Sequence, residues 1–219
     1  MNEAVLQRLK RLDSCALSDA LDSLELPAAV VGLQPLSSKR RIAGFAVTVQ
    51  LGPTPPAGGS TQHLGTEAIA NAGASDVIVI AHHPAAECAG WGGVLSVGAQ
   101  QAGICGVVLD GPARDIDEAT DLDFPIFATG PIARTARGRI WEQSTNQPVQ
   151  FAGVPVNPGD LVLADASGVV IIPAGRADEV IERAEKIMKR EQLMVAAIRR
   201  GDRITDVVGR DYEDMLKSL

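Results

Sequence analysis

The sequence predicts an α/β fold with a central, partly closed β-sheet, N-terminal helices and a long C-terminal helix. Two continuous apolar runs, at 76–81 and 105–109, are typical of strands buried on both faces of a parallel sheet. Short strand patterns separated by turn residues fill the second half of the chain. Helical spacing of apolar residues is strongest near the two ends.

The N-terminal helices are expected over about residues 3–26. Apolar side chains recur there at helical spacing, Ser14 is placed to cap a second helix, and Pro27 ends it. Residues 41–51 have the composition of a strand. A Pro/Gly-rich loop follows at 52–60, and the pattern over 63–72 predicts a helix.

The middle of the chain predicts a parallel βαβ unit. Strands at 76–81 and 105–109 flank a helix at 92–102, and such a crossover is almost always right-handed. Further short strands or loops are expected at 124–128, 134–141, 147–151, 153–156, 161–164 and 169–172. A helix over about 176–200 follows. Without a repeat or a linker, residues 1–219 are expected to form one domain.

Composition excludes several classes of function. The net charge is −7, the pI is about 5.0 and aromatic residues make up 3%, which argues against a nucleic-acid partner. No apolar run approaches the length of a membrane span. Cys15, Cys88 and Cys105 are odd in number and widely spaced, so we expect reduced thiols and a cytoplasmic location.

The densest group of candidate functional residues follows the strand that ends at Leu109. The chain turns there and presents Arg114 and Asp115. Ligands of α/β proteins bind at the carboxyl ends of strands. An arginine can bind a carboxylate with two hydrogen bonds, and an aspartate is a suitable ligand for Mg²⁺ or Mn²⁺. Taken alone, the dipeptide favours a surface ion pair.

A glycine-rich segment, Gly90 to Leu95, precedes the predicted helix at 92–102. Backbone N–H groups at such a helix start can bind an anion, although packing alone can also require glycine. His82, His83 and Glu87 follow the strand at 76–81. Adjacent residues of a strand point to opposite faces, so we favour supporting or surface roles for the two histidines.

The segment GWGGVLSVGAQQAGICGVVLDGPARDIDE (90–118) resembles the RraA-like family, which includes class II 4-hydroxy-4-methyl-2-oxoglutarate / 4-carboxy-4-hydroxy-2-oxoadipate aldolases. LSDALDSL, RIAGFAVTV and GVPVNPGDLVLADASGVVIIP extend the resemblance over most of the chain. It implies a three-layer ββα swivelling-type fold assembled as a homotrimer or hexamer. It also implies a lyase that cleaves a 4-hydroxy-2-oxo acid to pyruvate, decarboxylates oxaloacetate, or does both, with Mg²⁺ or Mn²⁺.

The resemblance also implies roles for particular residues. Arg114 matches the arginine that binds pyruvate, and Asp115 matches the metal ligand. The backbone amides of Gly92, Gly93, Val94 and Leu95 match a substrate-binding loop. Glu191, or less well Glu185, matches a glutamate of the adjacent subunit that holds a metal-bound water.

One position departs from the family pattern. The aldolases have an aspartate twenty-one residues before the arginine, where this chain has Gly93. Glu87, His82 or His83 could replace it, and Gly93→Asp is expected to raise aldol cleavage if the loop accepts a Cβ atom. Two other functions stay open: a non-catalytic, protein-binding regulator of the RraA type, and another metal-dependent enzyme of this fold that acts on a different carboxylate.

Overall fold

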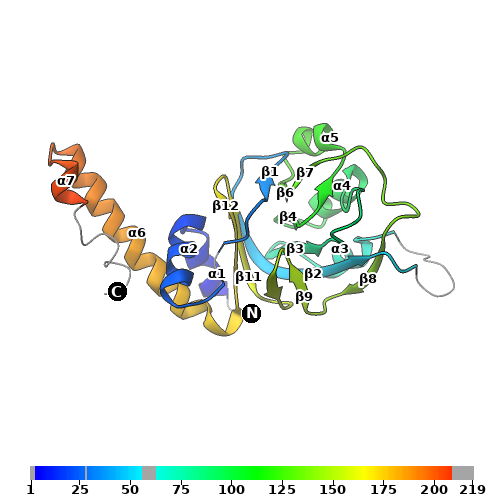
Figure 1. The fold of residues 1–219 in the computed structure, drawn as a ribbon, viewed down its shortest axis with the longest axis horizontal. Coiled ribbons are helices and arrows are strands. Elements are labelled where there is room, and N and C mark those ends of the chain that lie inside the picture. The colour runs from blue at the N-terminus through cyan, green and yellow to red at the C-terminus, as the bar shows by residue number, and fades with distance from the viewer. Residues whose placement is uncertain (1–2, 28, 56–62, 209–219) are drawn as a thin grey trace.

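The protein was analysed as a computed structural model, which describes residues 3–27, 29–55 and 63–208. Its described part contains a mixed sheet in the order β1-β6-β4-β3-β2-β11-β12, and β8 also pairs with β2 (Figure 1). The strands of this sheet are β1 (Gln34–Pro35), β2 (Ile42–Gly52), β3 (Asp76–Ala81), β4 (Gly106–Leu109), β6 (Ile126–Ala128), β8 (Trp141–Thr145), β11 (Leu161–Asp165) and β12 (Gly168–Ile172). Two small sheets pair β9 (Val149–Phe151) with β10 (Val154–Val156) and β5 (Pro112–Ala113) with β7 (Gly130–Pro131).

The helices form two groups on different sides of the sheet (Figure 1). One group packs near β11 and β12, and its long helix, α6 (Ala177–Arg199), extends away from the body. It consists of α1 (Glu3–Leu9), α2 (Ser14–Ser23), the 3₁₀ turn η1 (Ala174–Arg176), α6 and α7 (Ile204–Val207). The other group is α3 (Thr66–Asn71), α4 (Gly93–Gln101) and α5 (Ile116–Asp121). The predicted fold class is therefore confirmed.

Strand β2 contributes to both helical layers. Its side chains alternate between the two faces of the sheet, as in any strand. Ala43 and Phe45 pack in the core beneath α1, α2 and α6. Val47, Val49 and Leu51 pack in the core beneath α3, α4 and α5. The even-numbered residues Ile42 and Ala46 face a third core, which is enclosed by the curved sheet and the β9–β10 hairpin.

The predicted βαβ unit is confirmed. β3 pairs with β4 in parallel from Val77 opposite Gly106 to Ile80 opposite Leu109, and α4 lies between them in sequence. Ile78 and Ile80 of β3 pack toward α4, while Val77 and Val79 pack toward the third core. Burial of both faces explains why β3 is a continuous apolar run instead of an alternating one.

One local prediction requires correction, one helix was missed, and one predicted loop lies mostly outside the described residues. Asp13, not Ser14, caps α2, because the Asp13 carboxylate accepts a hydrogen bond from Ala16 N–H at 2.8 Å. The Ser14 hydroxyl instead donates to the carboxylate of Asp165 at 2.6 Å. Helix α5 was not predicted, because its sequence IDEATD has little apolar periodicity. Most of the predicted Pro/Gly loop, at 56–60, lies outside the described residues.

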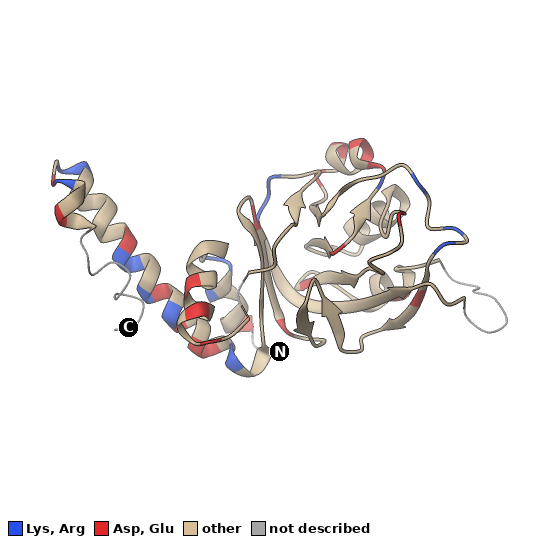
Figure 2. Cartoon of the chain, in the orientation of Figure 1, with Lys and Arg blue, Asp and Glu red and all other residues tan. Residues whose placement is uncertain are grey.

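Charged residues are unevenly distributed over the fold. Figure 2 shows them concentrated along α6 and α5 and in the chain between β7 and β8, while most of the central sheet carries none. Among the helices of the described residues, none is both long and apolar enough to cross a membrane.

Candidate active site

The glycine-rich segment and the Arg-Asp pair are held together by backbone pairing. Trp91 forms a parallel β-bridge with Ala113, and the Arg114 N–H donates to the Trp91 carbonyl at 3.0 Å. The Trp91 ring is buried, stacks on Phe124 with centroids 6.3 Å apart, and donates its Nε1–H to Ser96 at 2.9 Å. These contacts fix the start of α4 beside the carboxyl end of β4.

Asp115 occupies the N-cap position of α5 in the left-handed backbone region, with φ 57° and ψ 43°. Aspartate and asparagine tolerate this conformation better than most residues with a side chain. Its Oδ2 accepts a hydrogen bond from the Gly93 N–H at 2.9 Å. Its carboxylate also contacts Arg114 Nε at 3.1 and 3.2 Å. The backbone and both contacts therefore orient the carboxylate.

Side chains occupy the space beside the two glycines, so a Cβ atom at either position would require those side chains to shift. A Cβ atom at residue 92 would lie 2.9 Å from Asp115 Oδ2 and 3.1 Å from Arg114 Cγ. A Cβ atom at residue 93 would lie 1.9 Å from Oε2 of Glu118. Gly92 has φ −161°, which is ordinary extended backbone, so the requirement at this position is steric and not conformational.

Arg114, Asp115 and the start of α4 line a pocket of about 250 Å³. Within the described chain, hydrogen bonds from the Arg114 guanidinium use Nε, which leaves both Nη groups available. The amides of Val94 and Leu95 belong to the first turn of α4, which has no intrahelical acceptor for them. The lining residues are His63, Leu64, Ala89, Trp91, Gly92, Gly93, Val94, Leu95, Arg114, Asp115, Thr135, Ala136 and Arg137.

The predicted substitutes for the missing aspartate do not line this pocket. Glu87 is exposed and pairs with Arg134 at 3.1 Å. His82 is buried, which agrees with a supporting role and not with a surface role, and its Nε2 has no hydrogen-bond partner in the described structure. The His82 N–H donates to Asp110, and burial raises the pKa of that carboxyl group. His83 contributes its carbonyl to the His82 ring, 3.0 Å from Nδ1.

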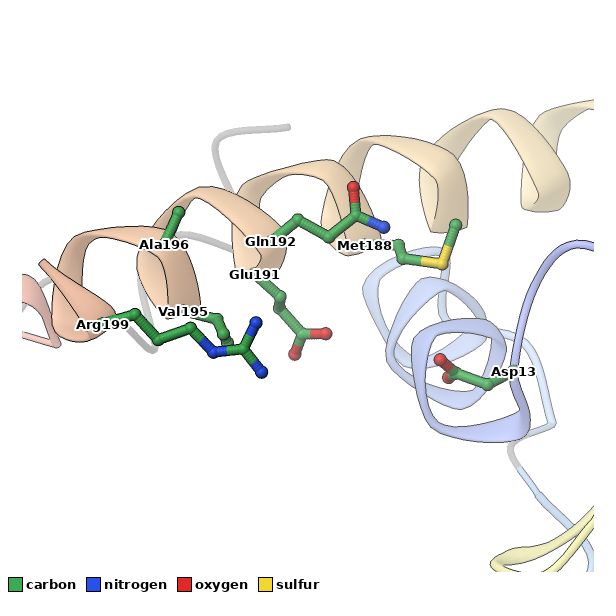
Figure 3. Close-up of a pocket in the computed structure, with 7 residues that line it drawn as sticks. All are labelled: Asp13, Met188, Glu191, Gln192, Val195, Ala196 and Arg199. Atoms are coloured by element: carbon green, nitrogen blue, oxygen red, sulfur yellow. The ribbon is translucent and has the colours of Figure 1, made fainter.

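Glu191 is on α6, the helix that extends from the body, whereas Arg114 and Asp115 directly precede α5 in the other helical group (Figure 1). It lines a second pocket, of about 720 Å³, between α6 and the start of α2. Figure 3 shows the carboxylates of Glu191 and Asp13 directed into this space. Burial, followed by the charges of Asp13 and Asp19, raises the pKa of Glu191.

The alternative residue on this helix, Glu185, is already paired. Its carboxylate accepts two hydrogen bonds from the guanidinium of Arg8, at 2.7 and 2.9 Å. This contact lowers the pKa of Glu185 and ties α6 to α1. Of the two glutamates considered from the sequence, Glu191 is therefore the one with an available carboxylate.

The pocket has the donors for a divalent cation that keeps most of its waters. In the parts of the chain that the structure describes, no three His, Cys, Asp or Glu side chains are grouped as a metal site. Mg²⁺ commonly takes only one or two protein carboxylates and retains several waters. Asp115, half-buried at the pocket wall, can supply one such ligand.

Three residues near the site were not assigned a role from the sequence. Thr135 and Arg137 line the pocket from the segment between β7 and β8. Glu118 lies in the first turn of α5, and its carboxylate lies beside Gly93 at the start of α4. Helical spacing does not relate Arg114 to Glu118, because Arg114 precedes the left-handed N-cap residue Asp115 and lies outside α5.

Comparison with known proteins identifies the family. A model of the RraA-like family, described as Aldolase/RraA, matches residues 14–171, and the chain therefore belongs to this family. It is 34% identical over 183 residues, 83% of this chain and 82% of the relative, to a Halalkalibacterium halodurans protein named "Putative 4-hydroxy-4-methyl-2-oxoglutarate aldolase". It is 32% identical over 197 residues to Legionella pneumophila protein DlpA, covering 90% of this chain and only 32% of DlpA. An uncharacterized protein from Pseudomonas syringae pv. tomato has a similar structure, with a TM-score of 0.85, 31% identity, and coverage of 95% of this chain and 98% of that one.

Proposed function

We propose that this protein is a divalent-metal-dependent lyase that acts on 2-oxo acids. The observation that carries the proposal is one pocket lined by Arg114, by Asp115 and by the first turn of α4. Similarity to a protein with an aldolase name supports a lyase. The reaction would be retro-aldol cleavage of a 4-hydroxy-2-oxo acid, decarboxylation of oxaloacetate, or both.

Different residues of the pocket would bind the substrate and the metal. The Nη groups of Arg114 would hold the substrate carboxylate, and the amides of Val94 and Leu95 would donate to the same end. Asp115 would hold Mg²⁺ or Mn²⁺, with its orientation fixed by the Gly93 N–H. A bound cation supplies Lewis-acid stabilisation of the charge that develops on the 2-oxo oxygen. Arg114 adds a fixed positive charge at this end of the substrate.

A second carboxylate on the substrate could bind Arg137. Arg137 lines the pocket and is exposed, and the guanidinium makes no hydrogen bond or ion pair within the described chain. Two arginines at one small pocket favour a dicarboxylic 2-oxo acid over a monocarboxylic one. We therefore propose a 2-oxo diacid as the substrate class.

We further propose that the working enzyme is a homotrimer or hexamer in which Glu191 serves the pocket of a neighbouring subunit. Leu193, Val195 and Ile198 on the same helix are exposed apolar residues, which are typical of a covered interface. The three cysteines, Cys15, Cys88 and Cys105, are free, which favours a reducing, cytoplasmic compartment.

The test is pyruvate release from oxaloacetate with Mg²⁺ or Mn²⁺ and with EDTA. We expect turnover with metal, loss of turnover in EDTA, and recovery when excess metal is returned. Full activity in EDTA would contradict metal dependence. No release of pyruvate under any of these conditions would favour the alternatives of the same family, a non-catalytic regulator of the RraA type or an enzyme for another carboxylate.

A further inference from the structure

The space beside Gly93 contains the carboxylate of Glu118. Residue 118 lies in the first turn of α5, and its Oε2 is 1.9 Å from where a Cβ atom of residue 93 would be. A side chain at residue 93 and the present position of the Glu118 carboxylate therefore exclude each other. Because residue 93 is glycine, the carboxylate of Glu118 on α5 can occupy the space that a side chain at residue 93 would fill.

In contrast to Asp115 and Asp110, Glu118 has a carboxylate without a partner among the described residues. Asp115 is held by Arg114 and by the Gly93 N–H, and Asp110 accepts hydrogen bonds from His82 and Ala152. The Glu118 carboxylate makes no hydrogen bond or ion pair with any residue that the structure describes, and its side chain is exposed. Glu118 does not itself line the pocket, but Gly93, which its carboxylate adjoins, does. The unpaired side chain would have to turn past Gly93 to contact a ligand there.

We propose that Glu118 is the general base for aldol cleavage, an inference that rests on the lyase function proposed above. Its carboxylate would take the proton of the 4-hydroxyl group of the substrate. The O–H electrons then form the C4 carbonyl, the C3–C4 bond breaks, and its electron pair becomes the enolate of pyruvate. Protonation of C3 gives pyruvate and a second 2-oxo compound, and the proton held by Glu118 returns to solvent or to C3.

This assignment changes what is expected of Gly93→Asp. An aspartate at residue 93 would displace the Glu118 carboxylate and would approach Asp115 Cβ, which lies 3.1 Å from the Cβ position. The single substitution therefore should not raise cleavage, in contrast to the expectation from the sequence. The informative variant is Gly93→Asp combined with Glu118→Ala, which moves the carboxylate from one element to the other.

The experiment compares two reactions in a set of variants. Oxaloacetate decarboxylation needs no hydroxyl proton removed, whereas cleavage of 4-hydroxy-4-methyl-2-oxoglutarate does. Glu118→Gln should lower kcat for cleavage by about 10²–10⁴-fold and leave decarboxylation near the parental rate. Glu118→Asp should retain part of the cleavage activity. Asp117→Asn, which removes an exposed acid from the same helical turn, is the matched control and should change neither reaction.

Two further measurements separate a base from a metal ligand or a structural residue. Titration with Mn²⁺ should give the same affinity for Glu118→Gln as for the parent chain, and its melting temperature should be unchanged. The Gly93→Asp/Glu118→Ala double variant should cleave the aldol substrate about tenfold or more faster than Glu118→Ala alone, within the range that a general base contributes.

Failure of the base role of Glu118 and failure of the proposed lyase function give different outcomes. If the parent chain releases pyruvate from oxaloacetate but Glu118→Gln lowers both reactions equally, or leaves cleavage unchanged, Glu118 is not the base. The same conclusion follows if the parent chain decarboxylates oxaloacetate and cleaves no 4-hydroxy-2-oxo acid. If the parent chain acts on neither substrate with metal present, the proposed lyase function fails and the base assignment fails with it.

Discussion

Replacing Asp115 with asparagine should remove metal-dependent turnover and leave the fold intact. Asparagine also tolerates the left-handed backbone at this position, where φ is 57°. Its side-chain oxygen can still accept the hydrogen bond that the Gly93 N–H donates at 2.9 Å. What the substitution removes is the negative charge, and with it the metal ligand and the ion pair with Arg114.

The cost in stability follows from the exposure of that ion pair. The side chains of Arg114 and Asp115 are 38% and 28% exposed, so solvent screens their attraction. Pairs of this kind contribute about 0–1 kcal/mol to the free energy of unfolding. For a chain of this size, the melting temperature should therefore fall by no more than about 4 °C.

Asp115→Ala is the contrasting variant. It also removes the acceptor for the Gly93 N–H and places alanine in the left-handed region. These effects together should lower the free energy of unfolding by about 1.5–4 kcal/mol. The assay is pyruvate release from oxaloacetate at saturating Mn²⁺, measured beside thermal unfolding of both variants. Asp115→Asn with the parental metal-dependent rate, or with a loss of stability as large as that of Asp115→Ala, would refute the reasoning.

Three more predictions concern other parts of the molecule. Gly92→Ala should displace the carboxylate that lies 2.9 Å from the new Cβ and lower kcat by about 10²-fold, and a parental kcat would contradict this steric argument. Glu191→Gln and Asp115→Asn chains should each be inactive alone and regain activity when mixed, because a mixed oligomer can combine an intact Glu191 with an intact Asp115. Light scattering should report a species larger than a monomer. No recovery on mixing would exclude a shared site. Asp165→Asn should lower stability at neutral pH by about 1–3 kcal/mol, because Asp165 accepts hydrogen bonds from Ser14 N–H, Ser14 Oγ–H and Ser167 N–H. Burial raises the pKa of Asp165, but these hydrogen bonds lower it overall. Urea unfolding should therefore show the stability difference between the parent and Asp165→Asn above about pH 4, and the difference should disappear as the pH falls through the lowered pKa. A difference that persists at pH 2 would contradict the assignment.

The elements that the sequence predicted well are those whose pattern is set by burial. β3 is apolar at every position but its first because both of its faces are covered, and α6 shows its periodicity because one stripe packs on α1 and α2. The cap of α2, which the sequence predicted wrongly, depends on single contacts. Asp13 and Ser14 are both good cap residues, and only the distant carboxylate of Asp165 decides which of them begins α2.

The candidate site was predictable as a segment but not as an arrangement. The resemblance indicated Arg114, Asp115 and the glycines, and the structure places these residues in one pocket. The neighbours of that segment could not be inferred in the same way. Glu118 reaches Gly93 through the left-handed turn at Asp115, a backbone conformation that no periodicity reports. Arg137 arrives from a segment without regular structure, so its position depends on tertiary contacts alone.

The joint packing of α1, α2 and α6 has a consequence for how the chain is made. Ala43 and Phe45 of β2, with Leu161, Leu163 and Val170 of β11 and β12, are covered by helices from both halves of the sequence. A ribosome adds about 5–20 residues per second, so α1 and α2 emerge several seconds or more before α6 can join them. During that interval α1 and α2 lack α6 and, until residue 172 has been added, also the strands β11 and β12 on which they pack. Chains that stop before α6 are therefore natural clients for chaperones and proteases.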